Sequence, residues 1–161
     1  MVTMSIENRF TVRGHSRVTD QSGNPLYDVK GTFSLWRKKR IRDLDGNVLY
    51  TVRNKMLKLP LTMHSAYIYD AEGNKIGRLK QKFRLKGQFD LIESKEDYCI
   101  TCGTIMNPAI DIFRNGIKIA DGIRQVKIIG ICDAFTVTCS EEDAPFVLTL
   151  IIAMDNIIDR H

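Results

Sequence analysis

The sequence predicts a mainly β fold, in which a closed antiparallel barrel of about ten to twelve strands encloses one hydrophobic C-terminal α-helix. Two observations support this prediction. A turn motif recurs between β-rich stretches, a pattern typical of a meandering antiparallel sheet. The one segment that reads as a helix is apolar on every side, so other structure must enclose it. At 161 residues, with 43% hydrophobic and 27% charged residues, the chain from 1 to 161 is expected to form a single domain.

The recurring turn motif has the pattern Asp-x-x-Gly-Asn and begins at Asp20, Asp43 and Asp70. In each copy the aspartate side chain can accept a hydrogen bond from the backbone two residues later, and the Gly-Asn pair supplies the left-handed conformation that reverses the chain. Asn115-Gly116 lies in a fainter fourth copy. Each copy therefore predicts the tip of a β-hairpin, and the unequal spacing of the copies argues against a solenoid.

Two patterns suggest metal sites, and neither is complete. Asp43-x-Asp45 begins like a calcium loop but lacks the further ligands and the distal glutamate that such loops use. Cys99 and Cys102 are spaced like half of a zinc knuckle, but they lie in a predicted strand, where residues three apart point to opposite faces. The other two cysteines, Cys132 and Cys139, are too far apart to complete a zinc site. We expect free thiols and no metal or cofactor.

The helix is predicted near the C-terminus. Ser140 to Asp143 supplies a candidate N-cap and acidic first-turn residues, and Pro145 is tolerated early in a helix. The following residues, 146–154, are almost entirely apolar. A barrel of ten to twelve strands leaves a lumen wider than side chains fill, and a helix is about 10–12 Å across. The helix is therefore expected to fill the barrel.

Segments that match a known family occur in order along most of the chain, from about Phe10 to Asp155. They are Val29–Leu35, Ile68–Asp70, Leu79–Lys82, Asp133–Val137 and Leu150–Asp155, together with the Asp-x-x-Gly-Asn turns. In order and coverage they resemble the LURP-one-related family, whose fold is shared with the tubby C-terminal domain and the phospholipid scramblases. The resemblance implies twelve strands around a central helix. Tubby relatives bind phosphatidylinositol bisphosphate and scramblases are membrane proteins, so the resemblance also brings anionic lipid into consideration as a partner.

The sequence predicts a cytoplasmic protein that meets a membrane only at its surface. No charged and then apolar leader of the secretory kind is present. The longest apolar run, 144–154, is much shorter than the roughly twenty residues that a bilayer requires. The proline- and cysteine-rich N-terminal extension of scramblases is also not seen, and the terminal helix is too short to span a membrane and ends in the polar residues Asp155, Asn156 and Asp159.

Positive charge is concentrated in one part of the chain. Between Lys30 and Lys86 there are fifteen Lys and Arg residues and four acids, a local charge of +11, whereas the whole chain carries +5. A basic surface attracts phosphate-rich polyanions through its summed potential. The candidate anion-binding or lipid-binding residues are Arg37, Lys38, Lys39, Arg40, Arg53, Lys55, Lys58, Arg78, Lys80, Lys82, Arg84 and Lys86.

These candidates are expected to form two groups. If residues 77–86 form a regular strand, the five alternating basic residues from Arg78 to Lys86 project from one face, although a bulge would break this stripe. The run Arg37–Arg40 cannot lie on one strand face and is expected at a hairpin tip. The competing interpretation is that this charge only solvates the outside of the barrel.

The function predicted from these patterns is that of a non-enzymatic binding module, which docks a basic barrel face onto anionic phospholipid headgroups or another polyanion. A structural or protein-interaction domain with a protein partner is the alternative, and nucleic-acid binding is a distant third. The histidines His15, His64 and His161 show no pairing with a nucleophile, and no G-x-S-x-G elbow or phosphate-binding glycine loop occurs. No catalytic residue is predicted.

Overall fold

The computed structural model describes residues 1–8, 14–32, 36–55, 65–83, 87–104, 106–125 and 133–158. Within these ranges it contains twelve β-strands followed by one α-helix. The strands are β1 (Val2–Asn8), β2 (Ser16–Thr19), β3 (Pro25–Thr32), β4 (Trp36–Arg42), β5 (Val48–Lys55), β6 (Ser65–Tyr69), β7 (Lys75–Phe83), β8 (Gln88–Ile92), β9 (Tyr98–Cys102), β10 (Ala109–Arg114), β11 (Ile117–Gln125) and β12 (Ala134–Cys139), and the helix is α1 (Ala144–Ile158).

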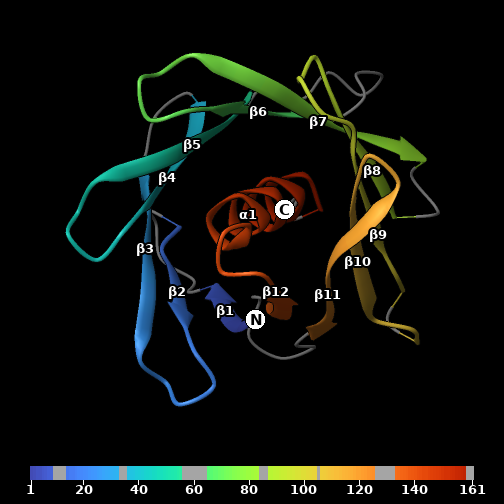
Figure 1. Cartoon of the computed structure of the whole chain (residues 1–161). Coiled ribbons are helices and arrows are strands. Elements are labelled where there is room, and N and C mark those ends of the chain that lie inside the picture. Colours follow the sequence, from blue (N-terminus) through green and yellow to red (C-terminus); the bar gives the residue numbers. More distant parts are fainter. Residues whose placement is uncertain are drawn as a thin grey trace.

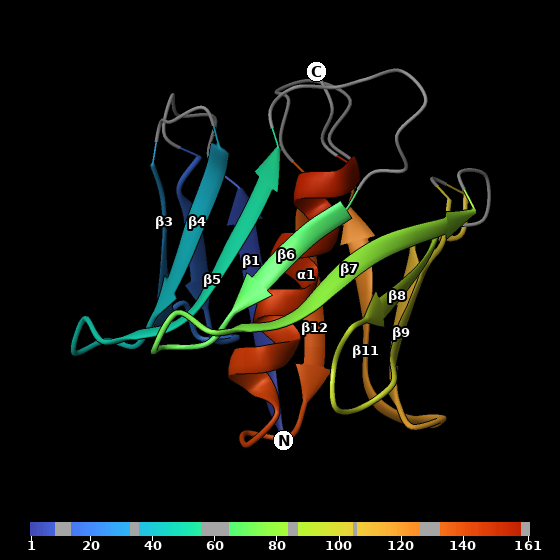
Figure 2. The same ribbon diagram turned by 90° about the horizontal axis from the view of Figure 1, so that it is seen from above.

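The twelve strands form a closed antiparallel barrel, as the sequence predicted. Each strand pairs with its neighbours in the sequence, and β1 closes the barrel by pairing with β12. In this closing pair, Val2 lies opposite Cys139 and Ile6 lies opposite Phe135. Figure 1 looks along the barrel and shows α1 inside the ring of strands. In Figure 2, α1 runs along the length of the barrel.

The three Asp-x-x-Gly-Asn motifs form hairpin tips, which confirms the prediction. In the first, the Asp20 carboxylate accepts hydrogen bonds from the backbone N–H of Ser22 at 2.8 Å and of Asn24 at 2.9 Å. The Asn24 side chain donates to the same carboxylate at 3.0 Å. Gly23 has a φ of 85°, the left-handed conformation that glycine adopts without strain. Asn115 and Gly116 also both have positive φ and join β10 to β11, as expected for a two-residue hairpin loop.

The helix supplies the centre of the core. Val147, Leu148 and residues 150–154 have no exposed surface, and the inward side chains of the strands surround them. The one polar residue within this segment, Thr149, donates its hydroxyl hydrogen to the carbonyl oxygen of Pro145 at 2.8 Å. The prediction that a hydrophobic helix fills the barrel is therefore confirmed. The helix packs against the sheet, chiefly at β5, β6 and β7.

The C-terminal part of α1 is attached to the barrel wall by buried polar groups. Asp155 accepts a hydrogen bond from the Asn8 side chain at 2.8 Å, and Lys39 Nζ lies 3.7 Å from the same oxygen. Asn156 donates to the side-chain oxygen of Asn54 at 3.1 Å. Buried polar groups need such partners, so these contacts fix how far α1 enters the barrel. No helix among the described residues is long and apolar enough to span a membrane.

Candidate anion-binding face

The outer surface of strands β4–β7 carries a cluster of basic side chains. In β7, Leu79 points into the core with no exposed surface, so Arg78 and Lys80 on either side of it point outward. In β4, Ile41 is fully buried, and the same alternation turns Arg40 and Lys38 outward. Arg53 of β5 lies between the buried residues Val52 and Asn54 and also faces out. We call these five residues, Lys38, Arg40, Arg53, Arg78 and Lys80, the basic face.

The strand register brings these residues into one row. Lys38 lies opposite Arg53, Arg53 lies opposite Tyr67, and Tyr67 lies opposite Arg78. Neighbouring strands are about 4.8 Å apart, so this row across four strands spans about 14 Å. Figure 1 shows these strands next to one another on one wall of the barrel. The wall is supported from inside by α1, so the basic face lies on well-packed structure.

Most of the positive charge on the basic face lacks an acidic partner. Arg78 pairs with Glu93 at 3.4 Å. Among the residues that the structure describes, Lys38, Arg40, Arg53 and Lys80 make no ion pair. Burial, and after it the charges of Arg40 and Arg53, lowers the pKa of Lys38. The like charges in this cluster therefore repel one another, and a bound anion would relieve that repulsion.

Two tyrosines of β6 lie among the basic residues and hold the guanidinium groups in place. The Arg53 guanidinium carbon lies 4.7 Å from the centre of the Tyr69 ring, and that of Arg78 lies 6.0 Å from the centre of the Tyr67 ring. Such cation–π contacts favour a fixed orientation of arginine. The Nε atoms of Arg53, Arg78 and Arg42 are buried and find no hydrogen-bond acceptor within the described ranges. The tyrosine ring therefore positions Arg53 without an ion pair, whereas Arg78 is held both by its tyrosine and by its ion pair with Glu93.

The structure corrects two predictions about the run Arg37–Arg40. The run lies within strand β4, because the chain does not turn until Asp43, so it does not form a hairpin tip. Lys39 is not on the basic face but points inward: its side chain is 13% exposed and pairs with the buried Asp155 of α1. Strand alternation explains the position of Lys39, because consecutive residues of β4 face opposite sides of the wall.

The predicted stripe on β7 is only partly regular. Arg78 and Lys80 share the outer face, and Lys82 is exposed and pairs with Asp90 at 3.3 Å. The pairing of β7 with β8 shifts register between Gln81 and Phe83, so a bulge interrupts the strand.

Five of the candidate residues lie wholly or partly outside the described residues. The backbone of Arg37 and Lys55 belongs to β4 and β5, but their side chains are not described. Lys58, Arg84 and Lys86 lie outside the described ranges. Their contribution to the basic face therefore stays a prediction.

Sequence reasoning missed the part played by the aromatic residues of β6. The alternation Tyr67-Ile-Tyr69 places both tyrosines on one face of β6, and that signal was readable from the sequence. Their position beside Arg53 and Arg78 depends on register across three strands, which no local pattern contains.

The described residues offer no clear site for metal or thiol chemistry. No three side chains of the metal-ligating types His, Cys, Asp and Glu converge within the described ranges. Cys99, Cys102 and Cys139 are free thiols, while Cys132 lies outside the described residues. Burial raises the pKa of Cys139 to about 11, which disfavours the reactive thiolate.

The fold defines the chain as a small β-barrel domain built around an internal helix. A family model described as LURP-one-related matches residues 2–155, and the chain belongs to this family. A crystal structure of a protein from Arabidopsis thaliana is similar over 98% of this chain and 92% of that chain, with a TM-score of 0.67 and 18% sequence identity. This likeness concerns the fold. A search of curated proteins found no match.

Proposed function

We propose that this protein is a non-enzymatic binding module whose basic face docks onto anionic phospholipid headgroups at a membrane surface. The observation that carries the proposal is the cluster of Lys38, Arg40 and Arg53, three adjacent cations without a carboxylate partner among the described residues. Headgroup phosphates seated between these side chains would supply the missing negative charge. Arginine held in a fixed orientation is well suited to paired hydrogen bonds with phosphate oxygens.

The expected strength of this binding follows from the number of unpaired charges. A basic residue near an anionic surface contributes about 1 kcal/mol. The four residues Lys38, Arg40, Arg53 and Lys80 therefore contribute about 4 kcal/mol together, or about a thousandfold in membrane partitioning. Salt weakens such contacts, because the screening length falls to about 8 Å at physiological ionic strength. The proposal thus requires binding that is reversible and salt-sensitive.

The tyrosines favour a lipid surface over single-stranded nucleic acid. Proteins that bind single strands stack bases on free aromatic faces. On this wall, Arg53 covers the Tyr69 ring, while Lys75 and Arg78 lie over the Tyr67 ring. These rings are already engaged, whereas the phosphates of a membrane need only the cationic groups. Tyrosine is also suited to the membrane interface, because its ring is apolar and its hydroxyl is polar.

The proposal is tested by co-sedimentation with vesicles of phosphatidylcholine, with and without phosphatidylserine. We expect binding only to the anionic vesicles. The double variant Lys38→Glu with Arg53→Glu should lose it, because each reversal removes an attraction and adds a repulsion. Arg17→Glu with Lys118→Glu changes the net charge equally, on β2 and β11, and serves as the control that should still bind. Because Lys118 pairs with Asp111 at 3.1 Å, thermal unfolding must first show that this variant is folded.

Two outcomes would reject the proposal. Binding that is equal for the two double variants would mean that net charge, and not the basic face, attracts the membrane. No binding of the unaltered protein to anionic vesicles at low salt would leave the basic face as a solvated barrel wall. In that case a protein partner at another surface becomes the better explanation.

A further inference from the structure

A cleft of about 810 Å³ opens at the end of the barrel where α1 begins. Its apolar wall consists of three aromatic rings with aliphatic side chains beside them. The Phe146 ring of α1 lies 5.3 Å from the Tyr50 ring and 5.0 Å from the Tyr98 ring, centre to centre. Leu91 and Ile76 extend this wall. The volume falls in the range of small-molecule binding sites, which also combine an apolar wall with a few polar groups.

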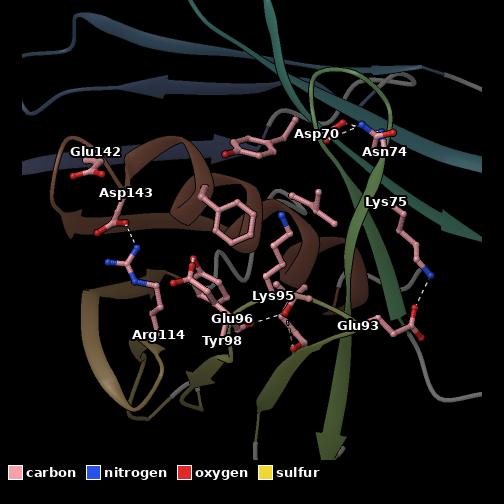
Figure 3. A pocket seen from close by; sticks show the side chains of 15 residues that line it. Asp70, Asn74, Lys75, Glu93, Lys95, Glu96, Tyr98, Arg114, Glu142 and Asp143 are labelled. Atoms are coloured by element: carbon pink, nitrogen blue, oxygen red, sulfur yellow. Dashed lines mark hydrogen bonds and ion pairs between the residues drawn. The ribbon is translucent and has the colours of Figure 1, made fainter.

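Charged residues surround the aromatic wall, and some of them neutralise one another. At one side, Arg114 donates to Asp143 at 2.7 Å. At the other side, Lys75 donates to Glu93 at 2.5 Å, and Figure 3 shows the two pairs on opposite sides of the cleft. These pairs account for four of the eight charged residues that line it. The ligand preference of the cleft therefore depends on the other four.

The four remaining residues give the cleft an acidic character. Three are carboxylates, Asp70, Glu96 and Glu142, and the fourth is Lys95. The Asp70 carboxylate accepts hydrogen bonds from Asn74 within its hairpin tip, so Glu96 and Glu142 are the carboxylates left to face a ligand. Glu96 lies against the aromatic wall, because the Tyr98 hydroxyl donates to it at 2.9 Å. Negative charge beside aromatic rings favours a cation, since the ring faces also attract positive charge.

The start of α1 does not convert the cleft into an anion site. A helix N-terminus attracts anions through backbone N–H groups that lack a partner. Here the N–H groups of Phe146 and Val147 both donate to the carbonyl oxygen of Asp143, at 3.1 and 2.9 Å. Pro145 has no N–H to offer. Arg114, the arginine among the described residues that line the cleft, is already paired with Asp143.

The chain itself places a cation in this cleft. Lys95 belongs to the turn between β8 and β9, and Figure 3 shows its side chain pointing into the cleft among the lining residues. A lysine consists of an apolar stem that ends in an ammonium group, so its stem can contact the aromatic wall while its charge faces the carboxylates. The cleft therefore accommodates the chemical shape of an alkylammonium ion.

We propose that this cleft binds an organic cation, a primary ammonium or guanidinium group on an apolar stem, and that Lys95 occupies part of the site in the free protein. Phe146, Tyr50 and Tyr98 would contact the stem, and Glu96 would face the charged group. This site uses residues other than those of the basic face, so it is independent of the function proposed above. The same ligand chemistry is available from a free amine or from a basic side chain of a peptide.

The test is an NMR titration of the full chain that follows backbone amide shifts at residues 94–98 and at Phe146. The probes are phenethylammonium and its isosteres of different charge, phenylethanol and phenylpropionate. We expect the cation to bind about fivefold more tightly than the neutral isostere, and the anion to bind weakest. Nα-acetyl-lysine N-methylamide, which keeps its side-chain ammonium group, forms a separate arm: tighter binding than phenethylammonium indicates a peptide ligand, and weaker binding indicates a free amine.

Single substitutions then test which residues form the site. Glu96→Gln should weaken the binding of phenethylammonium about threefold, whereas Lys95→Met should strengthen it by a similar factor by vacating the site and removing a like charge. Glu141→Gln removes a carboxylate that is exposed and does not line the cleft, and it should change nothing. Tyr50→Leu should weaken binding about threefold through loss of a ring.

The direction of the Lys95→Met effect shows whether the cleft prefers a cation. An increase in affinity cannot result from loss of folding, so this test does not depend on the stability of the variant. Weaker binding of phenethylammonium by Lys95→Met would overturn the proposal. So would tighter binding of phenylpropionate than of phenethylammonium, or equal binding of the cation and its neutral isostere. Amide shifts that occur on β4 and β5 instead of at the cleft would also overturn it.

Discussion

Lys38 and Lys39 are adjacent in β4 but face opposite sides of the barrel wall, so removal of the Lys38 charge should weaken binding and removal of the Lys39 charge should lower stability. Lys38 lies on the basic face beside Arg40 and Arg53. Burial is the largest cause of its lowered pKa, and the charges of these two arginines lower it further. Lys39 points inward to the Asp155 carboxylate, and the two side chains are 13% and 4% exposed. Substitution by methionine keeps most of the apolar stem in both cases and removes only the ammonium group.

The structure sets the expected sizes of the two effects. Removing one partner of a buried ion pair costs about 3–5 kcal/mol, because the other charge stays buried and uncompensated. Asp155 keeps the hydrogen bond from Asn8, so we expect the lower end for Lys39→Met, about 3 kcal/mol. In a domain of this size that corresponds to a fall in Tm of about 6–12 °C. Lys38→Met should stay within about 0.5 kcal/mol of the unaltered protein.

Thermal unfolding followed by circular dichroism measures the stability of both variants, and vesicle co-sedimentation measures their binding. Lys39→Met should unfold at lower temperature yet still bind anionic vesicles at a temperature where it is folded. Lys38→Met should keep its Tm and bind more weakly. If the two variants have the same Tm, the inward position of Lys39 is wrong; if Lys39→Met weakens binding more than Lys38→Met, the assignment of the basic face is wrong.

Three further predictions concern the barrel and its helix. Burial raises the pKa of the Cys139 thiol to about 11, against 9.0 for a free thiol. The stability that this protonated thiol contributes is therefore present below pH 9 and is lost as the pH rises from about 9 to 11. In urea titrations over this pH range, the free energy of unfolding should fall less steeply with pH for Cys139→Ala than for the unaltered protein. In the same titrations, Gly87→Ala should lower the free energy of unfolding several times more than Gly23→Ala. Both glycines have positive φ, but a Cβ on Gly87 would lie 2.0 Å from the backbone oxygen of Cys102, whereas a Cβ on Gly23 would have nothing within 4 Å. Leu150→Ala should lower the free energy of unfolding by about 3–5 kcal/mol, since a cavity in the middle of α1 cannot collapse inside a closed wall; a loss below 1 kcal/mol would mean that the helix is not enclosed.

Much of the fold was predictable because its signals are local. The turn at Asp20 needs only residues 20–24, and the same five-residue pattern occurs at Asp43 and Asp70. The enclosure of the helix followed from its composition, since residues 146–154 offer no polar face to solvent. These features depend on neighbours in the sequence, which is why residue types and spacing were sufficient.

The misplaced and missed residues depend on distant contacts. Lys39 belongs to a basic run, and nothing near it indicates that its partner is Asp155, a residue of a helix more than a hundred positions away. The cleft has the same origin: Tyr50, Tyr98 and Phe146 come from three separate elements and meet only when the barrel closes. Sequence reasoning found the concentration of positive charge, but strand register decides which of those charges share a surface.

The position of α1 in the chain order has a consequence for biosynthesis. The helix that fills the barrel follows all twelve strands in the chain, and β1 closes the barrel by pairing with β12. Both the filling and the closing of the barrel therefore depend on residues that are synthesised late. During translation the early strands emerge with nothing to surround and with unpaired edges, a state that attracts chaperones and promotes aggregation. A ribosome-bound chain stalled before Ala144 should therefore be degraded readily by protease, and resistance should arise in one step once the helix has cleared the exit tunnel.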